Sequence, residues 1–364
     1  MPKRAAAVVL LGLLAAGCAP SSGPIYVVSP QAVQKPWPDT LPHLDRRGAV
    51  LTRFDPQRSV FTLALGGALV DYRQGVARGF RDAFAADFNA VAADPEQPYS
   101  ALLRAADGSR VQLLRAQSGD ESRPVLLDAS AAAVIALPRD PARIDAFAAT
   151  VKAGGRRPVW ALLPVHASED SPLPDPAAAQ ALAFAAILHG ASGLIWQGED
   201  NYAARNAGMI GISPAPQLDY GIRTADAGSA PPRIATPAEA AAAKRLWQAV
   251  AQLNRRIARL QSALLQPDAM QAYEVAVEAS EPDRGRPAAP VRTILRPWEG
   301  GLLLIAVNID SASHAVRIGF PRPLQGATRG PGDEGFGPLD ADLARGLLHD
   351  RIEGHGLRLY RILP

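Results

Sequence analysis

The sequence predicts an α/β domain built on a parallel sheet, followed by a smaller antiparallel β-sandwich. Between about residues 59 and 196, short and almost wholly apolar runs alternate with segments of helical spacing. This pattern is typical of parallel strands that are covered by helices on both faces. After Met270 the pattern changes to short segments of alternating polarity, separated by Gly, Pro, Asp and Ser. Such segments are typical of antiparallel strands and their turns.

The chain begins with two basic residues and a short apolar run. Lys3 and Arg4 precede an apolar run, Ala5 to Ala16, which is shorter than the ~20 residues needed to span a bilayer and has the length of a signal-peptide core. The run ends in Leu14-Ala15-Ala16-Gly17-Cys18, which resembles the lipobox. That resemblance implies that Cys18, the only Cys in the chain, is acylated and becomes the first mature residue. The alternative is an ordinary signal peptide with a chance Cys, or a buried free thiol.

We therefore expect residues 1–17 to be a signal peptide and residues 18–50, which contain many Pro and Ser, to be a lipid-anchored spacer. Several acyl chains on one Cys hold a protein stably at a membrane without crossing it, so a membrane is an expected partner. Ala19 stands where an Asp favours inner-membrane retention in the lipoproteins that this signal resembles. The expected location is the outer membrane or the periplasm, anchored at Cys18.

Composition argues against several other classes of protein. Lys3 and Arg4 account for two units of the formal net charge of +3, so the mature chain carries +1 and lacks the basic surface of a nucleic-acid-binding protein. One Cys excludes an internal disulfide and a Cys-rich zinc site, and the 6 His show no ligand-spaced pair. The chain has no GxGxxG after a strand, no Walker loop and no GxSxG elbow. We expect no metal, no cofactor and no nucleic acid.

The first predicted domain, residues 51–268, contains the alternating strands and helices. Its clearest strands are 59–65, 88–91, 134–137, 158–165 and 193–196, with weaker candidates at 111–114 and 124–127, and its first helix is 72–84. Asp140 and Asp175 each precede a Pro, which favours a helix start because Asp caps the helix and the missing Pro N–H would have no partner there. Thr236-Pro237-Ala238-Glu239 is a capping box, and the helix that it starts extends to about residue 265. An apolar stripe at 3/4 spacing runs along this helix.

The second predicted domain, residues 269–364, is the antiparallel β-sandwich. Its predicted strands are 273–277, 291–295, 302–308, 315–320 and 357–362.

Several short motifs follow one another in a fixed order along the predicted strands. Residues 188–196, Leu-His-Gly-Ala-Ser-Gly-Leu-Ile-Trp, are similar to a late barrel strand of glycoside-hydrolase-type TIM barrels. Phe88-Asn89-Ala90-Val91 resembles their second strand, and Leu303 to Asn308 resembles a strand of their C-terminal sandwich. The resemblance implies a (β/α)8-type TIM barrel, complete or incomplete, followed by a small antiparallel β-sandwich. It also implies a glycan or oligosaccharide as the ligand.

Hydrolysis of a glycosidic bond needs two carboxyl groups that flank it, and in a barrel they lie at the carboxyl ends of strands. Glu199 and Asp200 follow the strand that ends at Trp196, and Asp128 follows the strand candidate at 124–127. We expect Glu199 and Asp128 to be the catalytic pair and Asp200 to bind substrate. The Asn-Glu dipeptide that carries the acid in the largest clan of these barrels is absent. The alternative role for each acid is a helix cap or a solvated loop carboxylate.

Aromatic and polar side chains near the same strand ends are expected to bind substrate. Trp160 and Trp196 lie in predicted strands, and aromatic rings at a barrel mouth can stack on sugars. Tyr202 and Arg205 lie in a long segment without periodicity, of the kind that is usually functional or disordered. His166 follows the strand at 158–165. The alternatives are a core position for each Trp and a solvated loop position for His166.

Two functions follow from these patterns. The first is a membrane-anchored, glycoside-hydrolase-like protein that acts on a glycan by paired-carboxylate acid/base hydrolysis. The second is a catalytically inactive glycan-binding or structural envelope lipoprotein on a degenerate barrel. Fold analogy does not decide between them, because one fold hosts many functions.

Overall fold

The computed structural model contains a seven-stranded, mostly parallel sheet and separate antiparallel sheets, which confirms the predicted mixture of a parallel α/β part and later antiparallel strands. It describes residues 25–28, 43–44, 50–51, 55, 57–66, 76–93, 112–115, 126–127, 132–153, 158–198, 204–205, 208–216, 218, 233–278, 290–330 and 339–364. Cys18 and the predicted signal peptide lie outside these residues. Within them, no helix combines the length and the apolar character needed to cross a membrane.

In the seven-stranded sheet, the strand that comes first in the chain and the strand that comes last lie side by side at the centre. Its order is β6-β5-β4-β10-β9-β8-β7. The strands are β4 (Thr62–Gly66), β5 (Ala90–Ala93), β6 (Gln112–Arg115), β7 (Leu126–Leu127), β8 (Ala132–Ala136), β9 (Val159–Pro164) and β10 (Gly193–Gln197). β4 and β10 pair in parallel, with Thr62 opposite Gly193. From β4 the sheet continues outward to β5 and β6, and from β10 it continues outward to β9, β8 and β7.

This order is the one that a (β/α) barrel requires, because in a barrel the last strand returns to the first. In the part of the chain that the structure describes, β6 and β7 are the two outer strands, and no pairing joins them. The described strands therefore form a sheet with barrel order, and they do not form a closed eight-stranded barrel.

The strand β7 runs against the direction that a barrel strand would have. It pairs antiparallel with β8, and Leu127 lies opposite Ala132. Only four residues, 128–131, separate the two strands, whereas a parallel pair needs a connection of a dozen or more residues. The carboxyl end of β7 therefore lies at the amino edge of the sheet, where β8 begins.

Side chains of the central strands alternate between a helix-covered face and an inner face. The helix-covered side chains belong to the main hydrophobic cluster and include Leu63, Leu65, Val159, Leu163, Leu194 and Trp196. On the inner face, residues in register on neighbouring strands form rows. The row near the amino edge of the sheet, called here the lower inner row, consists of Thr62, Gly193, Trp160 and Val134. This row is tight, because a Cβ on Gly193 would lie 2.7 Å from Cδ1 of Trp160 and 2.8 Å from Cβ of Thr62.

The helices begin at the predicted caps. Asp175 accepts a hydrogen bond from the N–H of Ala177 at the start of α5 (Pro176–Leu188). Thr236 and Glu239 form the predicted capping box of α7 (Pro237–Leu264). Asp140 caps a short 3-10 turn that leads into α4 (Ile144–Ala153), and α1 (Val76–Ala85) packs near β5.

The antiparallel part consists of two sheets, with orders β12-β13-β18-β15 and β1-β11-β14-β17-β16. Its strands are β11 (Glu274–Glu278), β12 (Val291–Trp298), β13 (Gly301–Asn308), β14 (His314–Gly319), β15 (Gly326–Gly330), β16 (Asp340–Asp342), β17 (Leu347–Ile352) and β18 (Leu357–Leu363). The strand β1 (Ile25–Val28) comes from the predicted spacer and pairs antiparallel with β11. A separate short pair, β2 (His43–Leu44) and β3 (Val50–Leu51), also lies in or next to that spacer.

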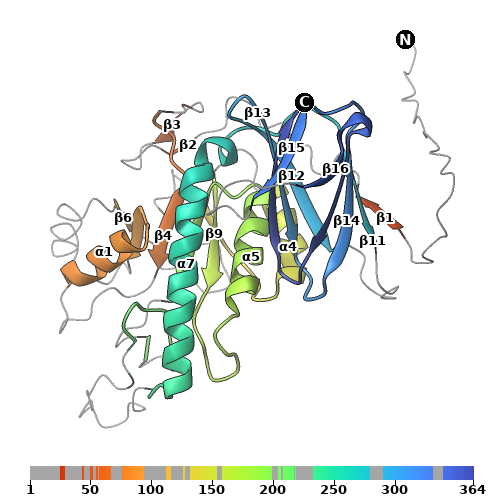
Figure 1. Cartoon of the computed structure of the whole chain (residues 1–364). Helices are drawn as coiled ribbons and strands as arrows, with labels where there is room; N and C mark the ends of the chain where they lie inside the picture. Colours follow the sequence, from red (N-terminus) through yellow and green to blue (C-terminus); the bar gives the residue numbers. More distant parts are fainter. Residues whose placement is uncertain are drawn as a thin grey trace, which may run out of the picture.

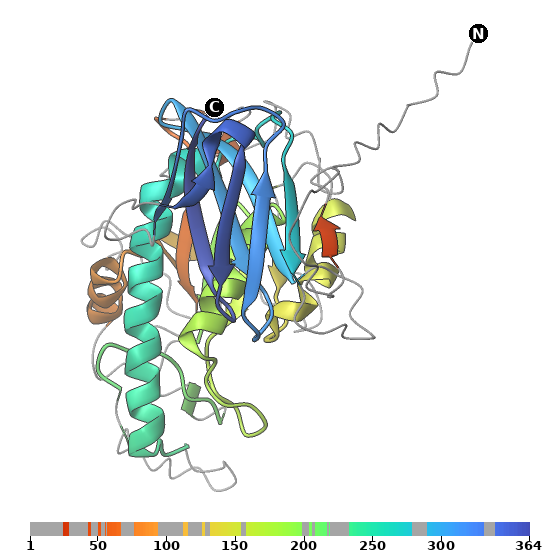
Figure 2. The ribbon, with the colours of Figure 1, turned by 45° about the vertical axis from the view of Figure 1, so that its right-hand side comes forward.

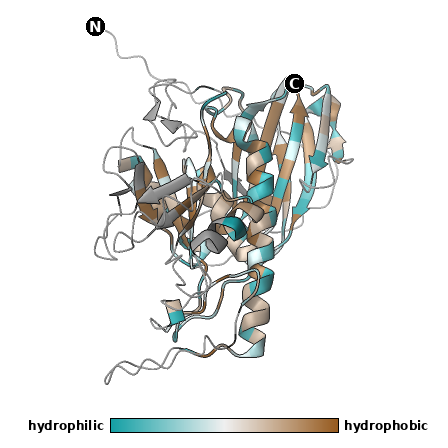
Figure 3. Ribbon diagram, turned by 90° about the vertical axis from the view of Figure 1, so that its left-hand side faces the viewer, coloured by the Kyte–Doolittle hydropathy of each residue, from teal (hydrophilic) through white to brown (hydrophobic). Residues whose placement is uncertain are grey.

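The elements are stacked in layers (Figures 1 and 2). Helices α5 and α7 lie between the parallel sheet and the sheet of β12, β13 and β18. Leu303 and Leu359 of that sheet belong to the main cluster with the helices, whereas Leu304 and Tyr360 belong to the core between the two sandwich sheets. In Figure 3, brown apolar residues are prominent along the strands and teal residues recur along α7. The sheet of β12, β13 and β18 is therefore buried on both faces.

Helix α5 is apolar on every side. All residues from Ala181 to Leu188 are buried, as expected for a helix without a polar face. The helix contacts β9 of the parallel sheet and also β12 and β13 of the sandwich. The sandwich and the parallel sheet consequently share one hydrophobic core.

Candidate functional site

The carboxyl edge of the parallel sheet is the candidate site, and its inner face is open there. Ala136 and Gln197 end β8 and β10 and are exposed, while Leu162 and Pro164 of β9 are half-buried. Trp160, in the lower inner row, is buried. The inner face is therefore packed near its amino edge and accessible to a ligand near its carboxyl edge.

Backbone hydrogen bonds fix the end of β10. The N–H of Gly198 donates to the carbonyl of Gly66 at 3.1 Å, and its own carbonyl accepts from the N–H of Ile212 at 2.6 Å. The φ of Gly198 is +136°, and a Cβ there would lie 2.9 Å from Cβ of His166. Nδ1 of His166 lies 3.3 Å from the carbonyl oxygen of Gln197. The side-chain amide of Gln197 at the end of β10 and the imidazole of His166 just after β9 therefore lie at the same edge of the sheet.

Sequence reasoning missed Gln197 as a site residue. The available signal was a polar side chain directly after the apolar run Gly193 to Trp196, two positions before Glu199. Because residues in a strand alternate between faces, Gln197 shares the inner face with Ile195 and Gly193. A search for carboxylates and rings overlooks such a residue.

Arg205 has a structural position in the loop that follows β10. Its side chain is 1% exposed, and Nη1 donates to the carbonyl of Arg233 at 3.1 Å. Arg233 also donates to the carbonyl of Gly208 and forms an ion pair with Glu239 at 2.8 Å. Arg205 therefore links two parts of this loop, and such complete burial leaves no exposed surface for the expected contact with substrate.

Both expected stacking residues are core residues in the structure. Trp196 is 0% exposed, and its Nε1 donates to Oδ1 of Asn254 at 3.1 Å. Nδ2 of Asn254 donates to the carbonyl of Ala86 at 3.0 Å. Trp160 is 2% exposed and fills the lower inner row. Neither ring has a free face for a sugar, so the structure does not support their predicted role in stacking.

The remaining predicted residues, Glu199, Asp200, Tyr202 and Asp128, lie outside the described residues. Glu199 and Asp200 directly follow Gly198, which lies at the carboxyl edge. The strand before Asp128 is β7, and its carboxyl end lies at the opposite edge. The premise for pairing Glu199 with Asp128, that both follow strands ending at one edge, is therefore wrong for β7.

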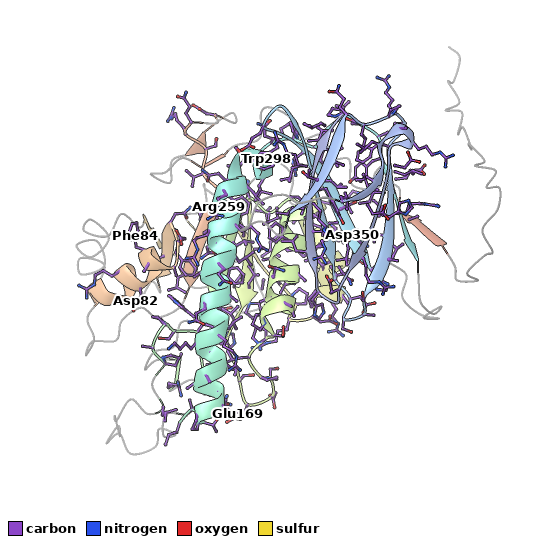
Figure 4. The ribbon with its side chains drawn as sticks, in the orientation of Figure 1. Asp82, Phe84, Glu169, Arg259, Trp298 and Asp350 are labelled. Carbon is purple, nitrogen blue, oxygen red and sulfur yellow. The ribbon has the colours of Figure 1, made fainter. Side chains whose placement is uncertain are left out.

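The described charges at the carboxyl edge lie in its loops. Nη1 of Arg139, after β8, donates to the carbonyl of Pro172 at 3.1 Å, and partial burial lowers the pKa of this guanidinium. Glu169 and Asp170 are exposed in the turn after β9, and Figure 4 shows Glu169 at the end of the molecule where α7 begins. Within the described ranges, no group of three His, Cys, Asp or Glu could hold a metal ion.

Comparisons with known proteins give a distant structural similarity. No family model and no curated protein matches the chain. A GH30 endoxylanase from Clostridium papyrosolvens has 9% identity and a TM-score of 0.33, with 84% of this chain and 97% of that chain covered. A maltogenic α-amylase from Thermotoga neapolitana has 8% identity and a TM-score of 0.41, with 84% and 99% covered. An α-amylase from Geobacillus thermoleovorans, complexed with acarbose, has 12% identity and a TM-score of 0.34, with 82% and 65% covered.

These structural neighbours are glycoside hydrolases. At such identities and TM-scores, the activity of this chain has to be argued from its own residues.

Proposed function

We propose that this chain is a glycan-binding lipoprotein of the bacterial envelope, with its ligand at the carboxyl edge of the parallel sheet. The observation that carries the proposal is the accessible inner face between β8, β9 and β10, where Ala136 and Gln197 are exposed. Barrels bind ligands at this edge, and open parallel sheets bind them outside the same strand ends. The location of the site is therefore the same for a closed and an open sheet.

The chemistry of the edge suits sugar hydroxyl groups. The amide of Gln197 can donate and accept hydrogen bonds, and a neutral imidazole such as that of His166 can do both as well. Leu162 and Pro164 are half-buried on the inner face and offer apolar surface to the C–H groups of a sugar ring. The resemblance of residues 188–196 to a late strand of glycoside-hydrolase barrels supports the same class of ligand.

Binding is favoured over hydrolysis by the direction of β7. Hydrolysis needs two carboxyl groups about 5–10 Å apart, and the strand before Asp128 ends at the amino edge, away from Gln197. Glu169 and Asp170 are the described carboxylates in the turn after β9, and both are exposed. The described part of the edge thus contains no buried carboxylate pair.

A glycan array with the soluble chain starting at Ala19 tests the proposal, followed by dissociation constants for the best ligand. Ala136→Trp places a large ring on the accessible inner face, so we expect at least about a tenfold loss of affinity, or about 1.4 kcal/mol. Ala153→Trp, at an exposed position of α4, is the matched control and should bind normally. Equal binding by both variants, or no glycan bound by the parent chain, would contradict the proposal.

Hydrolysis is the second candidate, because Glu199 and Asp200 directly follow Gly198 at the carboxyl edge. Incubation of the parent chain with its array ligands, followed by a reducing-end assay, distinguishes the two functions. If the chain hydrolyses its ligand, Glu199→Gln should abolish the release of new reducing ends while the ligand still binds. Absence of any release by the parent chain leaves binding as the function.

The envelope location is part of the proposal and rests on Cys18. Acylated Cys18 would anchor the mature chain through several acyl chains, and Ala19 supports outer-membrane sorting over retention in the inner membrane. Metabolic labelling with a palmitate analogue should label the parent protein and leave Cys18→Ser unlabelled. Separation of the two membranes then tests the outer-membrane assignment.

A further inference from the structure

Strand β1 changes the geometry of the predicted lipid anchor. It pairs antiparallel with β11 over four residues, from Ile25 opposite Glu278 to Val28 opposite Val275. β11 pairs in turn with β14, and β14 pairs with β17. The chain that follows Cys18 is thus joined to the outer sandwich sheet by a hydrogen-bonded strand.

The pairing limits the reach of the anchor. Ile25 is seven residues after Cys18, and seven extended residues span at most ~25 Å. Without β1, the next described element is β2, which begins at His43. That position is 25 residues after Cys18, and 25 extended residues reach ~90 Å. Pairing of β1 therefore shortens the maximum reach between three- and fourfold.

The strand also defines which part of the molecule is attached. β1 is the outermost strand of its sheet. Figures 1 and 2 show it at one end of the molecule, beyond β11, with α1 toward the other end. The attachment is therefore on the sandwich, and the sandwich lies between the attachment and α1.

We propose that β1 makes the sandwich the membrane-proximal part of the lipoprotein, with the edge of β1 and β11 held within about 25 Å of the bilayer surface. The partner of this edge is a lipid surface. The proposal rests on the proposed acylation of Cys18, and it is independent of glycan binding. A direct consequence is that the glycan site moves with a short tether and reaches only ligands close to the membrane.

A cross-link tests the pairing in the acylated protein. Cys18 is the only Cys and its thiol is consumed by acylation, so introduced Cys residues are the only free thiols. Val27 lies opposite Ala276, and Val27→Cys with Ala276→Cys should form a disulfide under mild oxidation. Val27→Cys with Glu274→Cys, two positions out of register, is the control and should cross-link much less. If both pairs cross-link equally, or if neither pair cross-links, the pairing of β1 with β11 is overturned.

Energy transfer to labelled lipid headgroups tests the distance in liposomes. A donor at Arg317→Cys, exposed on β14 next to β11, should transfer more energy than a donor at Phe84→Cys on α1, where Phe84 is 52% exposed. Replacing Ile25–Val28 by Gly-Ser-Gly-Ser keeps the chain length and removes the strand. Transfer from position 317 should then fall to the level of position 84. Equal transfer from both positions in the parent protein overturns the proposal.

The outcomes separate this inference from the proposed function. If the parent protein is not labelled by the palmitate analogue, the anchor and this inference are both wrong. Glycan binding can then still be tested in the soluble chain. A labelled protein with no difference between positions 317 and 84 would remove only the inference. Failure of the glycan array would leave the cross-link and the energy transfer as valid tests of the anchor.

Discussion

The hydrogen bond between Trp196 and Asn254 gives the most direct test of the core position of Trp196. Asn254 is completely buried in α7 and joins two other elements, through Trp196 Nε1 at 3.1 Å and the carbonyl of Ala86 at 3.0 Å. Asn254→Leu is similar in size but leaves both groups without this partner. Each unsatisfied buried group costs about 1–3 kcal/mol, so we expect a loss of about 2–6 kcal/mol in the free energy of unfolding.

A double-mutant cycle isolates the Trp196 contribution. Trp196→Phe leaves Oδ1 of Asn254 without its donor, at about 1–3 kcal/mol, in addition to a packing loss. In the double variant neither partner of that hydrogen bond exists, so the combined loss should be smaller than the sum of the single losses by about 1–3 kcal/mol.

Urea denaturation of the soluble chain starting at Ala19 measures these losses, with the midpoint and slope fitted for each variant. Gln252→Leu, at an exposed position of the same helix, is the control and should change stability by less than about 0.5 kcal/mol. Glycan affinity should be unchanged in any variant that stays folded. Additive losses, or a selective loss of glycan binding in folded Trp196→Phe, would refute the core assignment.

Three further predictions concern packing, pH and the sandwich. Gly193→Ala should lower stability by about 1–3 kcal/mol, because the new Cβ would meet Trp160 and Thr62, and Trp160→Leu in the same chain should recover part of that loss in urea denaturation. Burial, with a smaller contribution from Arg292, lowers the pKa of His189 to about 4. In the unfolded chain His189 binds a proton near pH 6.5, so the free energy of unfolding should fall as the pH drops from about 6.5 toward 4. The loss should be at most about 3 kcal/mol relative to His189→Gln. Parallel profiles of stability against pH for the parent chain and His189→Gln would contradict this. Asp350→Leu leaves the buried Tyr360 hydroxyl without its acceptor at 3.0 Å and should cost about 1–3 kcal/mol, whereas Asp340→Leu, at an exposed position of β16, should have little effect in the same assay.

The elements that depend on local interactions could be predicted from the sequence. Asp140, Asp175 and Thr236 cap helices as predicted, because a cap is set by side chains and N–H groups within three residues of each other. The switch to antiparallel strands after α7 was predicted for a similar reason, since alternation and turn residues are local signals. The strands β15, β16 and β17 were missed, and two of them contain Gly or charged residues at close intervals.

The direction of a strand and the side to which its residues point depend on the whole sheet. Both faces of the central strands are apolar, so the runs around Trp160 and Trp196 contain no alternation to show which ring faces the helices. The antiparallel β7 has the same kind of apolar residues as its neighbours. The short connection to β8 was the available sign that Asp128 does not follow a parallel strand.

The burial of α5 between two sheets has a consequence for dynamics. An amide in the middle of this helix, such as that of Phe184, is shielded by β9 on one side and by β12 and β13 on the other. Hydrogen exchange there requires the separation of both layers, so these amides should exchange at the rate of global unfolding. The sandwich consequently covers the face of α5 that points away from the parallel sheet, and a chain truncated before the sandwich would expose the most apolar of the described helices to water.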